Sequence, residues 1–140
     1  MNGGKGESAA ELRVVLAEDD DVLRRLVVHV LEKEGLRVLQ ARDGEEALKL
    51  IQSRRPDAII LDAMMPGVDG LEVLHTIRQS EATRDIPVMM LSGRSLERDM
   101  VTGFDFGAND YLVKPFRPAE LVVRLKRLLN PARRWERDER

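Results

Sequence analysis

Acidic residues follow two apolar segments of this chain at the points where buried strands would end. Four acids, residues 18–21, come directly after the apolar residues 14–17, and Asp62 comes directly after residues 58–61. Carboxylates at neighbouring strand ends repel one another at short range unless a cation lies among them. Carboxylate oxygens are the ligands that hard divalent cations such as Mg²⁺ prefer. The spacing therefore predicts a metal site where the acids of the two segments meet.

The four acids after the first segment also have a simpler use, which is to cap the helix that follows. An aspartate at a helix N-cap accepts hydrogen bonds from the first turn, and negative charge is favourable there. Asp20 or Asp21 is expected to serve as this cap. Glu18 and Asp19 lie nearer the strand end, so we assign these two to the metal together with Asp62.

Two further apolar segments end in a hydroxyl group and an ammonium group. Ser92 follows residues 88–91, and Lys114 follows residues 111–113 and precedes Pro115. An ammonium group can pair with a developing anion, and a hydroxyl can donate a hydrogen bond to one of its oxygens. A peptide bond before proline is also the usual place for a cis conformation, which can aim the preceding side chain.

Short apolar segments alternate along the chain with segments whose apolar residues lie three and four apart. This alternation predicts five buried strands and five helices, arranged as a parallel sheet covered on both faces. The predicted strands are residues 14–17, 38–41, 58–61, 88–91 and 111–113. The apolar stripe of the first helix comprises Leu23, Leu26, Val27, Val30 and Leu31, and that of the fourth comprises Leu96, Met100, Val101 and Phe104. Sites in such sheets form at the carboxyl ends of the strands, so the acids, the hydroxyl and the ammonium group should meet at one edge.

The composition is that of one folded domain. The 140 residues are 43% hydrophobic and 34% charged, and the net charge of −2 indicates no nucleic-acid or anionic-membrane surface. The chain has no cysteine, which excludes disulfides and thiolate sites. No apolar segment reaches the roughly 20 residues of a membrane span, and no signal core is present, so a cytoplasmic protein is expected. We divide the chain into a flexible tail (1–11), a domain (12–130) and a charged tail or start of a linker (131–140).

The order of these features resembles the receiver domain of two-component response regulators. The resemblance runs from about Arg13 to Asn130 and includes Leu-Asp-Ala-Met-Met-Pro-Gly-Val-Asp-Gly at 61–70 and Gly-Ala-Asn-Asp-Tyr-Leu-Val-Lys-Pro-Phe at 107–116. It implies a flavodoxin-like, doubly wound α/β fold with strand order 2-1-3-4-5 and five helices. The region around 107–124 is most similar to receivers of winged-helix transcriptional regulators.

The resemblance implies that Asp62 is a phosphoacceptor, which takes a phosphoryl group from a histidine kinase or a phosphotransfer protein. Glu18, Asp19, Asp62 and the backbone carbonyl of Met64 would bind Mg²⁺, for which Mn²⁺ could substitute. The side chains of Met64 and Arg94 border the phosphoryl group in such domains and tune its hydrolysis. A large apolar residue beside a long cationic one predicts a phosphoryl lifetime longer than in fast chemotaxis-type receivers.

The same resemblance assigns switching roles near the last strand. Ser92 and Lys114 would contact the phosphoryl group, with a cis bond between Lys114 and Pro115. Movement of Ser92 toward the phosphoryl group would open space into which Tyr111 rotates. These shifts would rearrange the surface formed by the fourth helix, the fifth strand and the fifth helix, and so control an output domain or protein partner.

Two surfaces are implied for partners. Asp110 and Arg124 fit one ion pair of a phosphorylation-dependent homodimer, and Glu120 fits half of another. Met100 stands where the basic partner of Glu120 would be expected, and Asn109 replaces a usual acid. The first helix is where sensor partners dock in this family, which makes His29, Arg24 and Arg25 candidates for that contact.

The predicted protein is a signalling switch and not an enzyme, apart from catalysing its own phosphorylation and dephosphorylation. We expect no direct contact with nucleic acid or membrane. One alternative is a pseudo-receiver that binds partners without carrying phosphate. A second is an Asp-dependent phosphatase, although its nucleophile would follow the first strand instead of the third. A third is a nucleotide-binding flavodoxin-like protein, which would need a glycine-rich or hydroxyl-rich loop where this chain has four acids.

Overall fold

The computed structural model describes residues 11–93 and 97–130, with the backbone alone at 97–100. The tail predicted for residues 131–140 lies outside these ranges, as do residues 1–10 of the N-terminal tail and Arg94. The domain boundaries 12–130 therefore stay a prediction. None of the described helices is long and apolar enough to span a bilayer.

Five parallel strands form one sheet in the order β2-β1-β3-β4-β5. They are β1 (Arg13–Ala17), β2 (Arg37–Ala41), β3 (Ala58–Asp62), β4 (Val88–Ser92) and β5 (Asp110–Val113). Every residue of β3 and β4 is buried, as expected for central strands that have helices on both sides. The predicted doubly wound fold and its strand order are confirmed.

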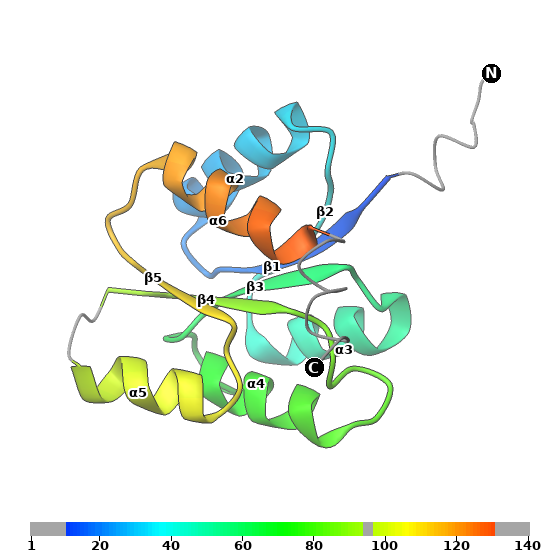
Figure 1. Ribbon diagram of the computed structural model, residues 1–140, viewed down its shortest axis with the longest axis vertical. Coiled ribbons are helices and arrows are strands. Elements are labelled where there is room, and N and C mark those ends of the chain that lie inside the picture. Colours follow the sequence, from blue (N-terminus) through cyan, green and yellow to red (C-terminus); the bar gives the residue numbers. More distant parts are fainter. Residues whose placement is uncertain (1–10, 94–96, 131–140) are drawn as a thin grey trace.

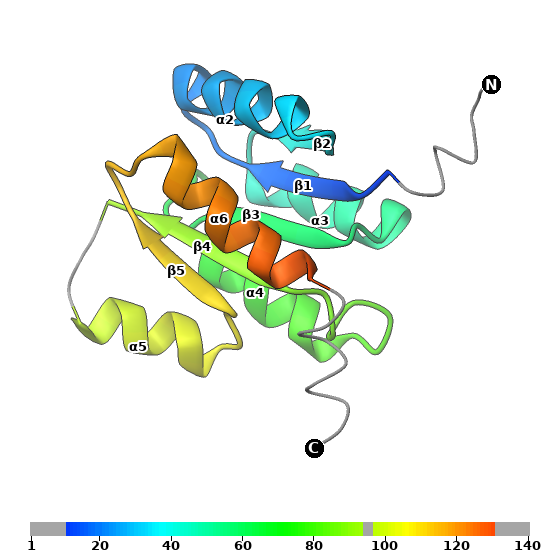
Figure 2. The ribbon, with the colours of Figure 1, turned by 45° about the horizontal axis from the view of Figure 1, so that its top comes forward.

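Five helices connect the strands and cover both faces of the sheet (Figure 1). They are α2 (Asp21–Lys33), α3 (Gly44–Arg54), α4 (Gly70–Gln79), α5 (Glu97–Asp105) and α6 (Pro118–Leu129). Helices α2 and α6 lie on one face, and α3, α4 and α5 lie on the other (Figure 2). This arrangement leaves the carboxyl ends of the strands together at one edge.

Aspartate caps decide where three of the helices begin. Asp20 has an extended backbone, and its Oδ1 accepts hydrogen bonds from the main-chain N–H groups of Val22 and Leu23 at 3.0 and 3.1 Å. Asp43 and Asp69 cap α3 and α4 in the same way. Asp20 is therefore the N-cap of α2, and Asp21 is its first helical residue. Of the two predicted caps, Asp20 is confirmed and Asp21 is wrong.

The core has two layers because alternate residues of each strand face opposite sides of the sheet. Ile59 and Leu61 of β3 pack in the layer that includes α3 and α4. Ile60, between them, packs in the layer that includes α2 and α6. Each layer closes one face, so the strand ends are supported from both sides.

Two apolar stripes differ from the sequence prediction. In α2 the buried residues are Arg24, Val27 and Leu31, whereas Leu26 is 45% exposed. The stripe that meets the sheet runs through positions 24, 27 and 31, which turns Leu26 toward the solvent. In α5, Val101 and Phe104 are also about half exposed, because this helix lies over the edge strand β5 and covers it with Gly103.

Candidate functional site

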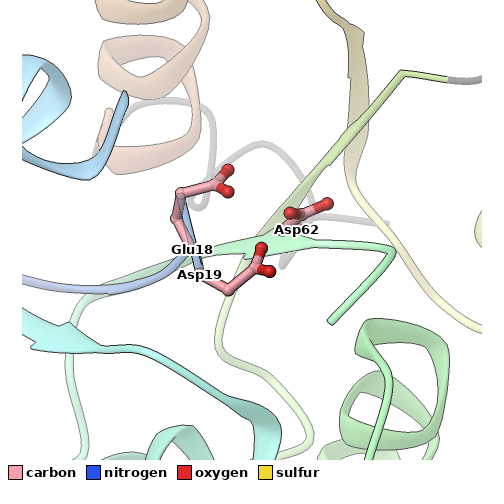
Figure 3. Close-up of side chains that lie close together, drawn as sticks. All are labelled: Glu18, Asp19 and Asp62. Atoms are coloured by element: carbon pink, nitrogen blue, oxygen red, sulfur yellow. The ribbon is translucent and has the colours of Figure 1, made fainter. Parts of the chain in front are cut away.

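The strand register brings the acids of β1 and β3 together. Ala17 is the register partner of Leu61, so Glu18 comes opposite Asp62 one position further along. Carboxylate oxygens of Glu18, Asp19 and Asp62 all lie within 4.8 Å of one another. Figure 3 shows the three side chains converging from the ends of the two strands. The three predicted metal-binding side chains thus share one place at the sheet edge.

Glu18 is fully buried, although it is a charged residue type. Its Oε2 accepts a hydrogen bond from the Asp20 main-chain N–H at 3.0 Å, while its Oε1 makes no hydrogen bond of regular geometry with the described residues and pairs with the Lys114 ammonium group at 2.9 Å. Burial raises the pKa of Glu18 to about 7, an effect that Lys114 partly opposes and Asp62 reinforces. The metal-free site therefore holds a carboxyl group that gains or loses its proton near neutral pH.

Asp62 is also buried, with 3% of its surface exposed. Its Oδ1 accepts a hydrogen bond from the Met64 main-chain N–H at 3.0 Å, and its Oδ2 lies 3.2 Å from Lys114 Nζ. Gly70, the first residue of α4, lies directly against this strand end. A Cβ atom at Gly70 would come within 2.2 Å of the Asp62 main-chain oxygen, so only glycine fits there.

Lys114 joins the two buried acids. Its Nζ lies 2.9 Å from Glu18 Oε1 and 3.2 Å from Asp62 Oδ2. Burial by itself would lower the pKa of Lys114, but the two carboxylates outweigh it and raise that pKa. The main-chain N–H of Lys114 donates to the carbonyl oxygen of Ser92 at 2.7 Å, and the Lys114–Pro115 bond is cis, as expected. Ser92 is buried at the end of β4, beside β3.

The residues present fit a hard divalent cation. Three carboxylates supply oxygen ligands only, and the buried oxygen Glu18 Oε1 has no hydrogen bond of regular geometry among the described residues, only the Lys114 ammonium group 2.9 Å away. One ammonium group among three carboxylates leaves negative charge that a divalent cation would compensate. Asp19 is exposed, so the cluster is open to the solvent on one side. This donor set suits Mg²⁺ or Mn²⁺ and not a softer metal.

The family model of the response regulator receiver domain matches residues 14–126. The chain belongs to the response regulator receiver family. The matched segment runs from the second residue of β1 into α6, and the acidic edge lies within it. A receiver domain of two-component signalling thus accounts for both the fold and the residues gathered at the edge.

Named relatives agree with this assignment. The receiver is 41% identical over 117 residues to the phosphate regulon transcriptional regulatory protein PhoB of Klebsiella pneumoniae, covering 84% of this chain and 51% of that protein. It is 41% identical over 125 residues to the transcriptional regulatory protein AfsQ1 of Streptomyces coelicolor, covering 89% and 53%. This receiver spans about half the length of these curated relatives.

A solved structure gives the same picture. The chemotaxis protein CheY4 of Vibrio cholerae superposes with a TM-score of 0.81 at 34% identity, covering 85% of this receiver and 99% of that chain. The likeness therefore extends over nearly all of a chemotaxis-type receiver and over the matched half of two transcriptional regulators.

Tyr111, the predicted switch residue, is buried in this structure, with 5% of its surface exposed. Its ring packs against Phe104 with 6.3 Å between ring centroids, and a Cβ atom at Gly103 would lie 3.2 Å from two of its ring carbons. The Tyr111 side chain is therefore packed inward beside α5 in this structure, and its predicted rotation stays a prediction.

The residues assigned to a dimer face pair within one receiver. Arg124 Nη1 lies 2.7 Å from Asp110 Oδ1, and Arg124 Nη2 lies 3.1 Å from Glu120 Oε2. These three residues also line a hollow of about 650 Å³ between the start of β5 and α6. The Met100 side chain lies outside the described part, so the missing half of the second pair stays a prediction.

Asn109, which stands in place of a usual acid, serves as a hydrogen-bond acceptor. Its side-chain oxygen accepts from Arg78 Nη2 at 3.0 Å and from the Val88 main-chain N–H at 2.8 Å. Arg78 also donates to the main-chain oxygens of Gly107 and Ile86. A neutral amide oxygen thus suffices to join α4 to the start of β5.

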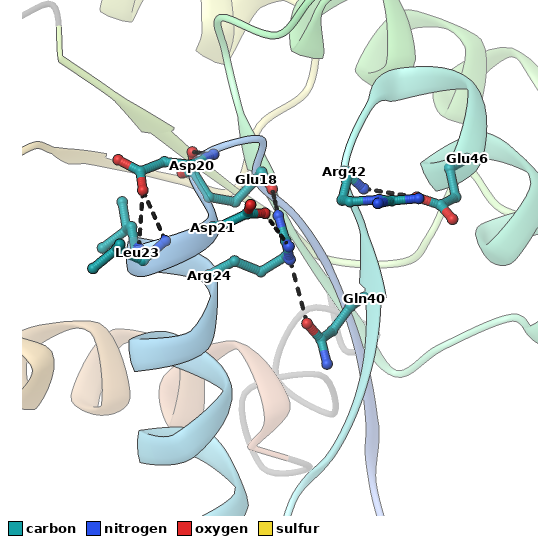
Figure 4. Close-up of polar contacts among 9 residues, drawn as sticks. Glu18, Asp20, Asp21, Leu23, Arg24, Gln40, Arg42 and Glu46 are labelled. Carbon is teal, nitrogen blue, oxygen red and sulfur yellow. Dashed lines mark hydrogen bonds and ion pairs between the residues drawn. The ribbon is translucent and has the colours of Figure 1, made fainter.

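The structure places one residue differently from its sequence interpretation. Arg24, expected to face a sensor partner, is only 8% exposed. Its guanidinium donates hydrogen bonds to Glu18, Asp21 and Gln40 through all three of its nitrogen atoms (Figure 4), so it is engaged within the chain. Arg25 and His29 are exposed, as that contact requires. The burial of Arg24 could have been predicted from its position, since it lies three residues before Val27 and so on the same face of the helix.

Proposed function

We propose that this receiver is a phosphorylation-dependent switch whose phosphoacceptor is Asp62. The observation that carries the proposal is the contact of one partly buried ammonium group, that of Lys114, with both Asp62 and Glu18. A buried aspartate beside a cation and two further acids is arranged to receive a dianionic group together with a metal. A surface aspartate used only for solubility would need none of these neighbours.

The metal of this site is proposed to be Mg²⁺, held by Glu18, Asp19, Asp62 and the backbone carbonyl of Met64, with Mn²⁺ as a substitute. Bound there, Mg²⁺ would neutralise charge on the oxygens of the transferring group. Glu18 must be deprotonated to bind it, and its raised pKa makes that step sensitive to pH near neutrality.

The reaction is proposed to be phosphoryl transfer from a phosphohistidine of a histidine kinase or phosphotransfer protein. A carboxylate oxygen of Asp62 forms a bond to phosphorus while the bond from phosphorus to the histidine ring nitrogen breaks. The ring nitrogen of the donor keeps the electron pair. Lys114 and Ser92 are proposed to bind oxygens of the phosphoryl group, the first through its charge and the second through its hydroxyl.

The output is proposed to be a rearrangement of the face formed by α5, β5 and α6. Tyr111 is a residue of β5 whose ring packs against Phe104 of α5, and this contact supports its role as the moving residue. The partner that binds the rearranged face would be an output domain, another protein or a second receiver that pairs through Asp110, Glu120 and Arg124. Phosphorylation would then act by making or breaking the ion pairs that Arg124 now forms within one chain.

The side chains of Met64 and Arg94 are proposed to set the lifetime of the phosphoryl group. Met64 is 53% exposed and lies two residues after the phosphoacceptor, and Arg94 lies two residues after Ser92. A large apolar group and a long cation are expected to hinder the attacking water. Replacing both with small polar residues should shorten the lifetime, and an unchanged hydrolysis rate would contradict this proposal. The switch is also proposed to be cytoplasmic and to act in signalling instead of in metabolism.

The test is the mass of the intact protein after incubation with acetyl phosphate, with and without Mg²⁺. We expect the wild type to gain one phosphoryl group only when Mg²⁺ is present, and Asp62→Asn to gain none. Asp85→Asn changes an exposed aspartate in the same way and should behave as the wild type. No gain by a folded wild-type protein that also ignores beryllofluoride would favour the pseudo-receiver.

A further inference from the structure

Arg24 is a buried charged side chain to which the proposed phosphoryl transfer assigns no role. It lies in the first turn of α2, and only 8% of its surface is exposed. It occupies the same buried stripe as Val27 and Leu31, where an apolar residue would be expected. Removing a charge from water is costly unless hydrogen bonds and an opposite charge compensate it. The partners of Arg24 should therefore reveal why a charge stands there.

These partners come from three different parts of the fold (Figure 4). Nη1 donates to the main-chain oxygen of Glu18 at 2.8 Å, and Nη2 pairs with Asp21 Oδ1 at 2.5 Å. Nε donates to Gln40 Oε1 on β2 at 3.3 Å. A planar guanidinium offers several donors in fixed directions, whereas a lysine ammonium is a single point on a flexible stem. One arginine therefore ties α2 to β2 and to the end of β1.

Glu18 is the partner that belongs to the acidic cluster, and it is held at three points. Its main-chain N–H donates to the Ala41 carbonyl oxygen at 3.0 Å, and its own carbonyl accepts from Arg24. Its Oε2 accepts from the Asp20 main-chain N–H at 3.0 Å. The oxygen left over is Oε1, which lies 2.9 Å from Lys114 Nζ. The direction of this oxygen depends on the main-chain bonds that hold Glu18.

The ion pair with Asp21 has a second consequence. Asp21 Oδ1 pairs with Arg24 Nη2, so the carboxylate of Asp21 offsets the charge of the guanidinium. Asp21 is 61% exposed in its side chain and lies outside the group of Glu18, Asp19 and Asp62. Arg24 thus contacts the main chain of Glu18, while its charge is balanced by Asp21. Its guanidinium leaves the carboxylates of Glu18, Asp19 and Asp62 available to a metal.

We propose that Arg24 is a positioning residue for the divalent-metal site, an inference that rests on the proposed function. By holding the carbonyl group of Glu18, Arg24 sets the direction in which the side chains of Glu18 and Asp19 leave the end of β1. Residues that orient metal ligands in this way typically change metal affinity by about 10- to 100-fold when they are replaced. Arg24 therefore acts on the metal through Glu18, without touching it.

The experiment measures the Mg²⁺ dissociation constant of the folded, unphosphorylated chain by titration calorimetry. The first variant is Arg24→Met, which removes the hydrogen bonds to Glu18, Asp21 and Gln40. The second is Arg24→Lys, which keeps the positive charge but not the several fixed donors of the guanidinium. Arg25→Met is the matched control, because Arg25 is the adjacent residue of the same helix and is exposed. Urea unfolding without Mg²⁺ is measured in parallel, so that stability and metal affinity are read separately.

We expect Arg24→Met to weaken Mg²⁺ binding by about tenfold or more, Arg24→Lys to weaken it less, and Arg25→Met to leave it unchanged. In the acetyl phosphate reaction, the half-saturating Mg²⁺ concentration should rise by the same factor, while the rate at saturating Mg²⁺ falls little. Where Arg24→Met does not fold, Arg24→Lys carries the same test.

A folded Arg24→Met with wild-type Mg²⁺ affinity and only lower stability in urea would overturn the inference and leave a structural role. That result would not affect the proposed function, since the wild type would still bind Mg²⁺ and accept a phosphoryl group at Asp62. A wild type that neither binds Mg²⁺ nor accepts the group would instead overturn the proposed function, and the inference with it.

Discussion

The raised pKa of Glu18 predicts that the metal-free receiver becomes less stable as the pH rises through neutrality. Burial raises this pKa from 4.5 to about 7, so the folded state holds a proton that the unfolded state has already lost. The stabilisation is complete below about pH 4.5 and is lost as the pH rises through about 7. At about 1.4 kcal/mol per pH unit the whole shift corresponds to about 3 kcal/mol. Because the cluster is open to solvent at Asp19, we expect screening to reduce this to about 1–2 kcal/mol.

The assay is urea unfolding followed by circular dichroism between about pH 5.5 and about pH 8.5, in the presence of a chelator. The comparison variant is Glu18→Gln, which keeps the size of the side chain and cannot ionise. Subtracting its free energy of unfolding from that of the wild type cancels all other titrating groups. We expect the wild type to lose about 1–2 kcal/mol relative to Glu18→Gln across this range.

Mg²⁺ should reverse the trend for the wild type. Metal binding requires the deprotonated carboxylate, so the stabilisation by Mg²⁺ should increase with pH over the same range, and Glu18→Gln should show little of it. A difference between wild type and Glu18→Gln that does not change with pH would refute the reasoning. It would mean that solvent reaches Glu18 well enough to keep its pKa near the ordinary value.

Further predictions concern positions where packing or hydrogen bonds are decisive. Gly70→Ala should cost about 3 kcal/mol or more in urea unfolding, because its Cβ atom would lie 2.2 Å from the main-chain oxygen of Asp62. Gly93→Ala is its control and should stay within about 0.5 kcal/mol, since a Cβ atom there meets no atom within 4 Å. Arg78→Met should cost about 2–3 kcal/mol by the same assay, because three carbonyl or amide oxygens lose a charged donor. An effect confined to about 0.5 kcal/mol would show that water replaces the arginine. Thr83→Val should cost about 1–2 kcal/mol, since the buried hydroxyl donates to a main-chain oxygen at 2.8 Å; an equally stable variant would contradict this.

Local patterns in the sequence determined the architecture and the composition of the site. Continuous apolar segments identify central strands, and apolar residues three and four apart identify the helices between them. In a parallel sheet every strand ends at the same edge, so Glu18, Asp62, Ser92 and Lys114 had to meet once the strands were located. Their types and order along the chain were enough to indicate a receiver.

Tertiary structure decided what each of these side chains experiences. Sequence spacing cannot distinguish Glu18, which is fully buried with a pKa near 7, from Asp19, which is exposed. It assigned Arg24 to a partner surface, whereas packing buries it against Glu18. It could not show that Arg124 bonds Asp110, fourteen residues away in the same chain; a dimer through these residues stays a prediction.

The physical reason is that desolvation and hydrogen bonding depend on distances between residues that are far apart in the sequence. Whether a carboxylate keeps water, and which donor reaches a carbonyl, is known only when helices are packed on the sheet. The order of apolar and acidic residues therefore determined where the site lies. The packing of α2 and β5 around that edge decided that Glu18 is the acid with the raised pKa, and that Arg24 is the arginine that donates to its carbonyl oxygen.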